Sequence, residues 1–286
     1  MRTRRMFSII TLTFNKLNYT QKCLESVLAT TGADYEVIAV DNGSTDGTQD
    51  YLRQAAADFA QKGMELRPVF NTANVGSPAG RNQAMKVARG EHFVFMDNDV
   101  MVKDADWLVR LRAALDADAK TAIVGPKIIY PFPPHLIQCA GVAISRTGRV
   151  QFRGRGEPND AAEFNQPKFV QCLISACFML KRALYEEIGE MDVDFSPLQF
   201  EDFDYCYRAR ERGHKVLYTP SVEVDHWESV TSEGTPAIAN REVMLKNWLK
   251  FKRKWQHAFA HEDGPPDSEC VWKKIQMPSL EGMRVR

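Results

Sequence analysis

The sequence predicts an α/β fold in which a doubly wound, mostly parallel sheet is flanked by helices. Two patterns support this fold class: apolar strand-like runs alternate with helix-length segments over the first hundred residues, and polar residues follow directly after several of these runs. The chain has 286 residues, 44% of them hydrophobic, so it can bury a large core in one or two domains. Its 37 basic and 37 acidic residues cancel, which disfavours binding to nucleic acid through bulk charge.

Strand and helix signals alternate in the first part of the chain. Strands are expected at residues 7–13, 35–40, 65–70 and 92–96, which are rich in β-branched and aromatic residues. Helices are expected from Asn18, a candidate N-cap, to Leu28, and at 49–59 and 78–87. Strands joined by helix-length connections form parallel sheets, and such sheets bind ligands beyond the carboxyl ends of their strands.

From about residue 100 the alternation becomes less regular. The expected elements are a strand at 122–130, a hairpin within 140–155, a polar loop at 154–166, a β-like run at 169–180, helices at 181–188 and 200–212, and short strands at 215–218 and 222–224. We interpret this part as an elaboration of the same sheet. The predicted organisation is one domain over residues 1–235, with halves at about 6–100 and 101–235, followed by a C-terminal helix and tail over 236–286.

The sequence of residues 240–256 predicts an amphipathic helix. The segment contains six basic residues and one acid, Glu242. Four large apolar residues recur at helical spacing on one side: Met244, Trp248, Phe251 and Trp255. The first interpretation is that the aromatic side packs on the body of the protein. The alternative is a peripheral helix that contacts anionic lipid at the inner face of a membrane.

The N-terminal sequence bears on the cellular location. Arg2, Arg4 and Arg5 precede an apolar run, as in a signal peptide, but no small-residue cleavage site follows, and the run suits a buried strand better. No stretch approaches the roughly 18 apolar residues of a membrane span. The six cysteines form no CxxC pair and are expected to be reduced. We therefore predict a cytoplasmic protein.

Two aspartates, Asp97 and Asp99, directly follow the fourth predicted strand. Neighbouring carboxylates resist ionisation unless a cation offsets their charge, and a divalent ion bound by carboxylates and substrate phosphates would do so. The structural alternative is a turn in which these side chains hydrogen-bond the backbone. The DxD triplet by itself is a weak signal, because such triplets are frequent by chance.

Further polar residues follow the neighbouring strands. Asp41 ends the second predicted strand, where it could bind a base or ribose. Asn74 and Arg81 lie in a polar cluster that enters a helix. The Arg81 guanidinium could bind phosphate in a bidentate manner, or it could form an ordinary surface ion pair.

A second group of acids, Glu201, Asp202 and Asp204, opens the predicted helix at 200–212. Acids in a first helical turn can simply interact with the helix dipole, and Asp204 can pair with Arg208 four residues later. His226 follows a short predicted strand near carboxylates, so it is either structural or a metal ligand. The chain contains no GxGxxG, GxxxxGK[ST], GxSxG or HExxH motif, so a phosphate-bearing ligand would be held by metal and carboxylates.

Taken in order, these blocks resemble the inverting glycosyltransferases of family two, which have the GT-A fold. The resemblance covers about residues 6–256 and is closest to the rhamnosyltransferase-like branch. The blocks that carry the resemblance are FSIITLTFN (7–15), DNGSTDGT (41–48), NVG (74–76) with RN (81–82), FMDND (95–99), SACFML (175–180), EDFDYCYRAR (201–210) and DH (225–226). One departure is Leu12, which stands where the family usually has proline, so the turn beside the base pocket is in doubt.

The resemblance implies roles for individual residues. Asp202, paired with Glu201, matches the general base, and Asp99, Asp97 and His226 match the positions that bind a divalent metal ion. The positions that match nucleotide-binding residues are Thr13, Asn15, Asp41, Asn74, Arg81 and Asp97.

The implied activity is transfer of a hexosyl or deoxyhexosyl group from a nucleoside-diphosphate sugar, of the UDP or dTDP type, with inversion and with Mn²⁺ or Mg²⁺. The acceptor would be a hydroxyl of a glycan, a lipid-linked molecule or another compound, in bacterial-type surface polysaccharide or glycoconjugate synthesis. Two alternatives stay open: a sugar-phosphate nucleotidyltransferase, although that family's glycine-rich loop is missing after the first strand, and a non-catalytic nucleotide-sugar-binding module.

Overall fold

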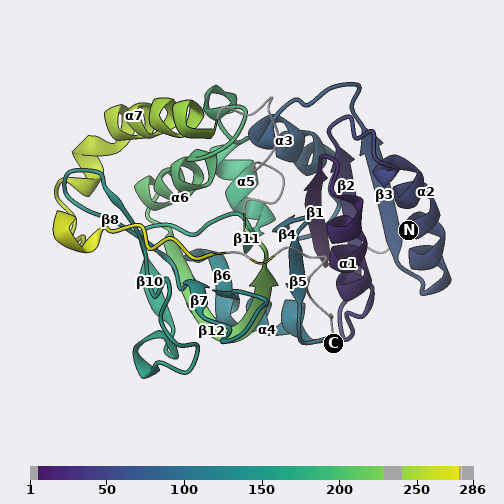
Figure 1. Cartoon of the computed structure of the whole chain (residues 1–286), viewed down its shortest axis with the longest axis horizontal. Helices are drawn as coiled ribbons and strands as arrows, with labels where there is room; N and C mark the ends of the chain where they lie inside the picture. The colour runs from purple at the N-terminus through teal and green to yellow at the C-terminus, as the bar shows by residue number, and fades with distance from the viewer. Residues whose placement is uncertain (1–5, 229–239, 277, 279–286) are drawn as a thin grey trace.

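The computed structural model describes residues 6–228, 240–276 and 278, and its centre is one large sheet (Figure 1). The strands are β1 (Phe7–Thr13), β2 (Tyr35–Asp41), β3 (Glu65–Phe70), β4 (His92–Asp97), β5 (Val100–Val102), β6 (Thr121–Ile129), β7 (Ile137–Cys139), β8 (Val142–Ile144), β9 (Val150–Phe152), β10 (Lys168–Val170), β11 (Cys177–Lys181) and β12 (Lys215–His226). Ten of them form the central sheet, in the order β10-β12-β6-β11-β4-β1-β2-β3, with β5 paired to β12 and β7 to β6. Both predicted halves of the chain therefore contribute to one sheet.

The direction of the strands decides which residues meet at an edge. β1 is parallel to β2 and β4, and β2 is parallel to β3. β11 is antiparallel to both β4 and β6, so β6 runs in the same direction as β4, and β12 is parallel to β6. The carboxyl ends of β1, β2, β4 and β12 consequently lie at the same edge of the sheet, which we call the carboxyl edge.

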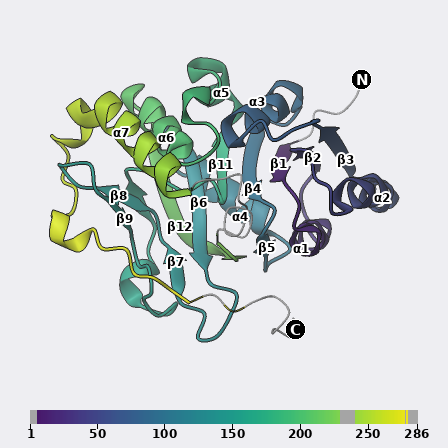
Figure 2. The same ribbon diagram turned by 45° about the horizontal axis from the view of Figure 1, so that its top comes forward.

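Helices cover both faces of the sheet. They are α1 (Leu17–Leu28), α2 (Thr48–Gln61), α3 (Ser77–Val87), α4 (Trp107–Asp116), α5 (Arg182–Ile188), α6 (Glu201–Glu211) and α7 (Asn240–Phe259), with short 3₁₀ turns at Ala162–Phe164, Val193–Phe195 and Asp267–Glu269. α1 and α4 pack on one face, α3, α5 and α6 on the other, and α7 lies on the outside of α6 (Figure 2). The mixed, mostly parallel sheet between two helical layers confirms the predicted fold class.

The predicted strands at 7–13 and 65–70 have the observed bounds, and the hairpin within 140–155 is present as β8 and β9. The β-like run at 169–180 is instead two strands, β10 and β11, because the residues between them leave the sheet toward α6. The two short strands expected at 215–218 and 222–224 form one strand, β12, since both parts pair with β6 across a register shift. α4, β5 and β7 were not predicted.

Helix ends and faces also differ from the prediction in two places. Asn18 is not an N-cap: α1 begins at Leu17, whose N–H donates to Asp46 Oδ2 at 2.9 Å. On α7, Phe251 and Trp255 are buried against α6 as expected, but Met244 is 49% exposed because the buried part of the helix begins at Asn247. None of the described helices has the length and hydrophobicity needed to cross a bilayer.

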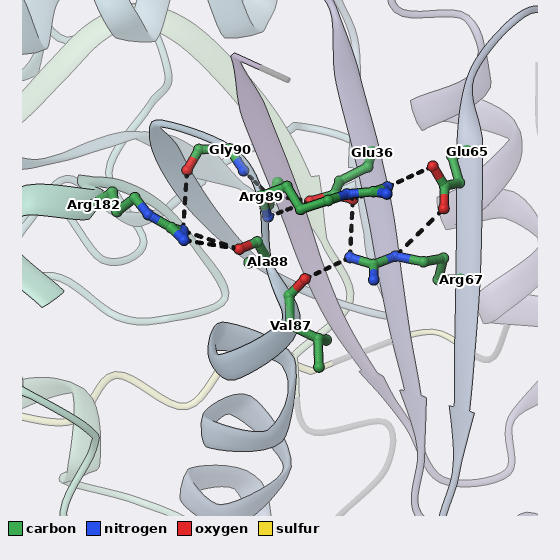
Figure 3. Close-up of polar contacts among 9 residues, drawn as sticks. Glu36, Glu65, Arg67, Val87, Ala88, Arg89, Gly90 and Arg182 are labelled. Atoms are coloured by element: carbon green, nitrogen blue, oxygen red, sulfur yellow. Dashed lines mark hydrogen bonds and ion pairs between the residues drawn. The ribbon is translucent and has the colours of Figure 1, made fainter. Parts of the chain in front are cut away.

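A buried ion-pair network fixes the opposite end of the sheet, which we call the amino edge (Figure 3). Glu36 of β2 is fully buried and accepts hydrogen bonds from Ser8 Oγ at 2.7 Å, Arg67 Nη2 at 2.9 Å and Arg89 Nε at 2.9 Å. Arg89 also reaches Glu65 at 2.5 Å. Because these residues come from β1, β2, β3 and the α3–β4 connection, the network joins three parallel strands at one end.

Candidate active site

Four of the predicted site residues end strands at the carboxyl edge. Thr13 closes β1, Asp41 closes β2, Asp97 closes β4 and His226 closes β12. The sheet topology brings His226 next to residues more than a hundred positions earlier in the chain. β5 pairs antiparallel with the end of β12, and Val100, directly after Asp99, lies opposite His226.

Asp97, Asp99 and His226 form the one cluster, in the part of the chain that the structure describes, of three or more side chains able to ligate a metal. One ligand atom from each lies within 4.8 Å of the others, and His226 Nε2 is 3.3 Å from Asp99 Oδ1. Asp99 and His226 are buried, whereas the Asp97 side chain is 36% exposed. Two carboxylates and an imidazole are a donor set that suits a divalent cation such as Mn²⁺.

Gln138 of β7 orients the His226 ring through Nδ1, the ring nitrogen that does not face Asp99. Its Nε2 donates to the His226 carbonyl oxygen at 3.1 Å, so its Oε1 is the atom that lies 2.5 Å from His226 Nδ1. An amide oxygen can only accept, so Nδ1 carries a proton and Nε2 is the ring atom available to a cation when the imidazole is neutral. No sequence pattern points to Gln138, because a glutamine in a three-residue strand belongs to no recognisable motif.

The electrostatic setting of His226 is strongly anionic. Burial alone would lower the pKa of His226, but the charge and hydrogen bond of Asp99, together with the charge of Asp97, raise this pKa to about 9. The imidazole therefore carries a proton at neutral pH in the absence of a cation. A bound metal ion would replace that proton.

Arg81 of α3 connects this cluster to α6. Its buried guanidinium donates to Asp97 Oδ1 at 2.8 Å, to Glu201 Oε1 at 3.2 Å and to the Ser175 carbonyl at 3.3 Å. Partial burial raises the pKa of Asp97 against the opposing effect of Arg81. Of the two expected roles of Arg81, the ion pair is present, but it is buried and not at the surface: the guanidinium bridges two groups of acids. The phosphate contact stays a prediction.

Asp202 is the only one of the three acids at the start of α6 that is not buried. Its Oδ2 accepts from the Ser175 N–H at 2.9 Å and from Ser175 Oγ at 3.2 Å. Partial burial of the Asp202 carboxylate raises its pKa, although the hydrogen bond from Ser175 and the charge of Arg81 oppose this rise. Ser175 thus holds an accessible carboxylate in place, as a proton acceptor requires.

Glu201 and Asp204 occupy different environments from Asp202. Glu201 is buried beside Arg81, its Oε2 has no hydrogen-bond partner among the described residues, and burial and the charge of Asp202 raise its pKa to about 7. Asp204 faces α7, where it accepts from Trp255 Nε1 at 2.8 Å, from Arg208 Nε at 3.0 Å and from Lys254 Nζ at 2.8 Å. The predicted Asp204–Arg208 pair is confirmed, and Asp204 joins α6 to α7.

The residues predicted to contact a nucleotide surround the ends of β1 and β2. Asp41 is fully buried and accepts from Thr13 Oγ1 at 2.8 Å, from the Ser44 N–H at 2.9 Å and from Gln49 Nε2 at 2.8 Å. Asn15, at φ 57°, accepts from the Thr45 N–H at 2.8 Å. Together these bonds hold the turn after β2 against the turn after β1.

Asn74 lies before the start of α3 and follows Ala73, whose backbone packs against Gly43 of the turn after β2. The Asn74 side chain is exposed and accepts from the Gly76 N–H at 2.9 Å. The exposed amide of Asn74 and the buried carboxylate of Asp41 therefore have different access to a ligand at the carboxyl edge.

Two aromatic side chains that the sequence analysis did not single out lie beside the metal-ligating cluster. The backbone N–H of Trp227 donates to the backbone carbonyl of Asp99 at 3.2 Å. The Trp227 ring packs edge-on against the ring of Tyr19 of α1, with centroids 5.6 Å apart. Burial and the charge of Asp99 raise the pKa of Tyr19. These contacts hold α1 and the end of β12 together around Asp99.

Comparison with known proteins identifies relatives with related sequences. The family model described as "Glycosyl transferase family 2" matches residues 8–189. The uncharacterized protein y4gI of Sinorhizobium fredii (strain NBRC 101917 / NGR234) is 29% identical over 263 residues, which are 89% of this chain and 28% of the relative. The O-antigen biosynthesis protein RfbC of Myxococcus xanthus is 28% identical over 240 residues, 81% of this chain and 18% of the relative. The chain thus spans less than a third of the length of either relative.

Solved structures show the same fold. The structure of GalNAc-T7 with UDP, GalNAc and Mn²⁺ superimposes with a TM-score of 0.70 at 17% identity, covering 91% of this chain and 49% of that one. The matched family segment contains Asp41, Asp97 and Asp99, which lie at the carboxyl edge at or just after the ends of β2 and β4. Because the family model matches more than half of the residues of this chain, the chain belongs to glycosyl transferase family 2.

Proposed function

We propose that this protein is a divalent-metal-dependent, inverting glycosyltransferase that moves a sugar from a nucleoside-diphosphate sugar to an acceptor hydroxyl. The observation that carries the proposal is the pairing of two sites: a metal-ligating cluster at Asp97, Asp99 and His226, and an accessible, oriented carboxylate at Asp202. Arg81 bridges the two sites through Asp97 and Glu201. Such a pair suits inverting transfer, in which a base accepts the acceptor proton on one side of the donor sugar and a cation stabilises the leaving group on the other.

The chain's own residues divide the chemistry between them. Asp99, Asp97 and His226 Nε2 would hold Mn²⁺ or Mg²⁺, which when bound offsets the charge that develops on the departing diphosphate. Asp202 would accept the proton of the acceptor hydroxyl while the acceptor oxygen attacks the anomeric carbon, so that one bond forms as the bond to diphosphate breaks. The raised pKa of Asp202 makes it a better proton acceptor than an ordinary surface aspartate.

The nucleotide would lie over the ends of β1 and β2. We propose Thr13, Asn15, Asp41 and Asn74 as residues that shape this part of the site, with Asp97 beside the ribose and metal. Arg81 would act on the nucleotide through Asp97, since its guanidinium already binds that carboxylate at 2.8 Å.

The proposed donor and pathway are based on what similar proteins contain or are named for. A structural neighbour contains UDP and Mn²⁺, and a sequence relative is named for O-antigen biosynthesis. We propose a UDP- or dTDP-linked hexose or deoxyhexose as donor and a glycan or lipid-linked hydroxyl as acceptor, in cytoplasmic synthesis of a surface polysaccharide or glycoconjugate. Membership of the rhamnosyltransferase-like branch is part of this proposal.

The test is turnover of several nucleotide sugars with Mn²⁺ by wild-type protein and by Asp202→Asn. Wild type is expected to release nucleoside diphosphate. Asp202→Asn should lose at least about a thousandfold in turnover, because it removes the proton acceptor, and should still bind nucleotide. Near-normal turnover by this variant would place the base elsewhere, with Glu201 next to be tested. Pyrophosphate exchange would indicate a nucleotidyltransferase, and nucleotide binding without either product would indicate a binding module.

We also propose that the outer face of α7 contacts an anionic membrane surface. The buried aromatic residues face α6, and the opposite side exposes Leu245 by 57% and Leu249 by 47%, with Lys246 and Arg253 beside them. The chain as a whole has no net charge, whereas residues 240–256 contain six basic residues and one acid, so α7 carries a local excess of positive charge. Each exposed cation near an anionic surface contributes about 1 kcal/mol.

Co-sedimentation with vesicles tests this contact. Wild type should bind vesicles that contain phosphatidylglycerol more strongly than pure phosphatidylcholine, and Leu245→Glu with Leu249→Glu should abolish the difference. Val109→Glu, on the exposed side of α4, is the matched control and should bind like wild type. Equal binding by all variants would contradict the proposal, as would binding that does not depend on lipid charge.

A further inference from the structure

α7 carries a buried asparagine that contacts the segment leading into the proposed catalytic helix. Asn247 is fully buried, and its Nδ2 donates to the carbonyl oxygens of Phe195 at 2.7 Å, Leu198 at 2.8 Å and Gln199 at 3.2 Å. Three acceptors around one amide nitrogen fix the orientation of the side chain, because the amide oxygen could not take that place. The asparagine lies outside the segment 8–189 that matches the family model.

The segment that Asn247 binds has an unfavourable backbone conformation. Gln199 and Phe200, directly before α6, have φ angles of 79° and 73°, in the left-handed region that non-glycine residues rarely adopt. Such residues are strained and persist only where surrounding contacts enforce them. The amide of Asn247 supplies such contacts from one side.

α3 holds the same segment from the other side. The Pro197 carbonyl accepts from the Ser77 N–H at 2.6 Å, and a Cβ on Gly76 would come within 2.9 Å of Pro197 Cα. The segment 195–200 is therefore fixed between the start of α3, the helix that carries Arg81, and the inner face of α7. Phe251, one turn after Asn247, packs on Phe200 with ring centroids 5.5 Å apart.

We propose that Asn247 is a positioning residue for Asp202. It holds residues 195–200 in the conformation that starts α6 at Glu201, and so aligns the Asp202 carboxylate with Ser175 and with an acceptor hydroxyl. This inference rests on the proposed function, in which Asp202 accepts the proton. It adds that the C-terminal helix is part of the catalytic unit rather than an appendage.

Loss of Asn247 should affect turnover more than donor binding. The residues proposed to hold nucleotide and metal lie at the ends of β1, β2, β4 and β12, in the turns that follow, or, for Asn74 and Arg81, at the start of α3 and within it. None of them contacts Asn247 or residues 195–199 through a described hydrogen bond. Asn247→Leu removes the amide donors at similar size, so the strained segment can relax and displace Asp202. A displacement of about 1 Å in such a group costs on the order of a hundredfold in rate.

The experiment measures kcat, donor KM and Mn²⁺ affinity for Asn247→Leu, Asn247→Asp and Trp255→Phe. Asn247→Leu should lower kcat by about ten- to a hundredfold while donor KM and Mn²⁺ affinity stay within about twofold. Asn247→Asp should be worse, because a carboxylate would face three carbonyl oxygens. Trp255→Phe is the matched control: it removes the 2.8 Å bond to Asp204, also between α6 and α7, and should retain kcat within about threefold.

The outcomes distinguish this inference from the proposed function. If Asp202→Asn is inactive and Asn247→Leu turns over like Trp255→Phe, Asn247 does not position the base and the proposed function stands. If Asp202→Asn keeps its turnover, the proposed base is wrong whatever Asn247 does. Should Asn247→Leu fail to give folded protein, Asn247→Ser is used, whose shorter side chain cannot reach all three carbonyls; an unchanged kcat in that variant would likewise overturn the inference.

Discussion

The two edges of the central sheet place buried and partly buried carboxylates in opposite electrostatic settings. At the amino edge, Glu36 meets two arginines and a serine, and its neighbour Glu65 shares the same arginines. At the carboxyl edge, Asp97, Asp99, Glu201 and Asp202 have one buried arginine, Arg81, and one imidazole among them. The amino edge is compensated by the protein itself, whereas the carboxyl edge has an excess of negative charge that a cation would offset.

The pKa shifts of the two edges follow this difference. Burial alone would raise the pKa of Glu36, but the hydrogen bonds from Ser8 and Arg89 and the charge of Arg67 hold it below the usual range. At the carboxyl edge burial prevails, and the pKa values of Asp97, Glu201 and Asp202 are all raised. Burial disfavours the ionised form of an acid at both edges, and the hydrogen bonds and charges of its partners decide whether the pKa ends up lowered or raised. Acids with raised pKa values are often found at functional sites.

The largest expected effect is at the amino edge. Glu36→Gln should lower the free energy of unfolding by about 3 kcal/mol, at the low end for breaking a buried ion pair, because Arg67 and Arg89 are 30% and 31% exposed and can reach water. Chemical denaturation at pH 7 measures this, and kcat per folded molecule should not change.

The pH dependence of Glu36 has a defined sign. Its folded-state pKa is lowered, so its contribution is present above the unfolded pKa and is lost as pH falls through the folded value. The stability difference between wild type and Glu36→Gln should therefore shrink in acid. A difference that stays constant down to the acid transition would mean that charge is not the cause.

The next largest effect concerns cation binding at the carboxyl edge. Because the His226 pKa is about 9 and a metal must replace its proton, affinity for Mn²⁺ should rise about tenfold per pH unit below that value, or about a hundredfold from pH 6.5 to 8.5. Calorimetry at several pH values measures this slope. His226→Ala should bind more weakly and show a flatter profile; an equally steep profile in that variant would exclude His226 as the group that loses the proton.

The smallest expected loss of stability comes from the counterpart of the first substitution. Glu201→Gln at the carboxyl edge should cause no loss in the free energy of unfolding at pH 7, because burial already disfavours the ionised form of Glu201 and raises its pKa to about 7. Since this pKa is raised, ionisation destabilises the wild type as pH increases from about 4.5 to 7, and the variant should be the more stable protein above pH 7. A loss near 3 kcal/mol would show that both edges are built for stability and would remove the contrast.

Local sequence patterns predicted the parallel half of the fold well. β1 follows a run rich in β-branched residues, β3 has the bounds expected from its place between two helix-length segments, and the hairpin at β8 and β9 lies where turn residues interrupt apolar ones. The division of 169–180 into two strands, and the continuity of β12, depended on which neighbours were present to pair. The packing of the α7 aromatics was predictable from helical spacing, but the exposure of Met244 depended on where the body of the protein ends.

The fold class, the family and the acids of the site could be recognised before folding is considered, because strand runs, their polar ends and the order of the motifs are all local patterns. The partners of these acids could not, because they come from distant segments. In the folded chain His226 contacts Asp99 and Gln138, Arg81 lies between Asp97 and Glu201, and Asp204 bonds to α7, whereas Asp202 stays partly exposed. The physical reason is that the ionisation and reach of a carboxylate depend on burial and on charges brought from distant parts of the chain.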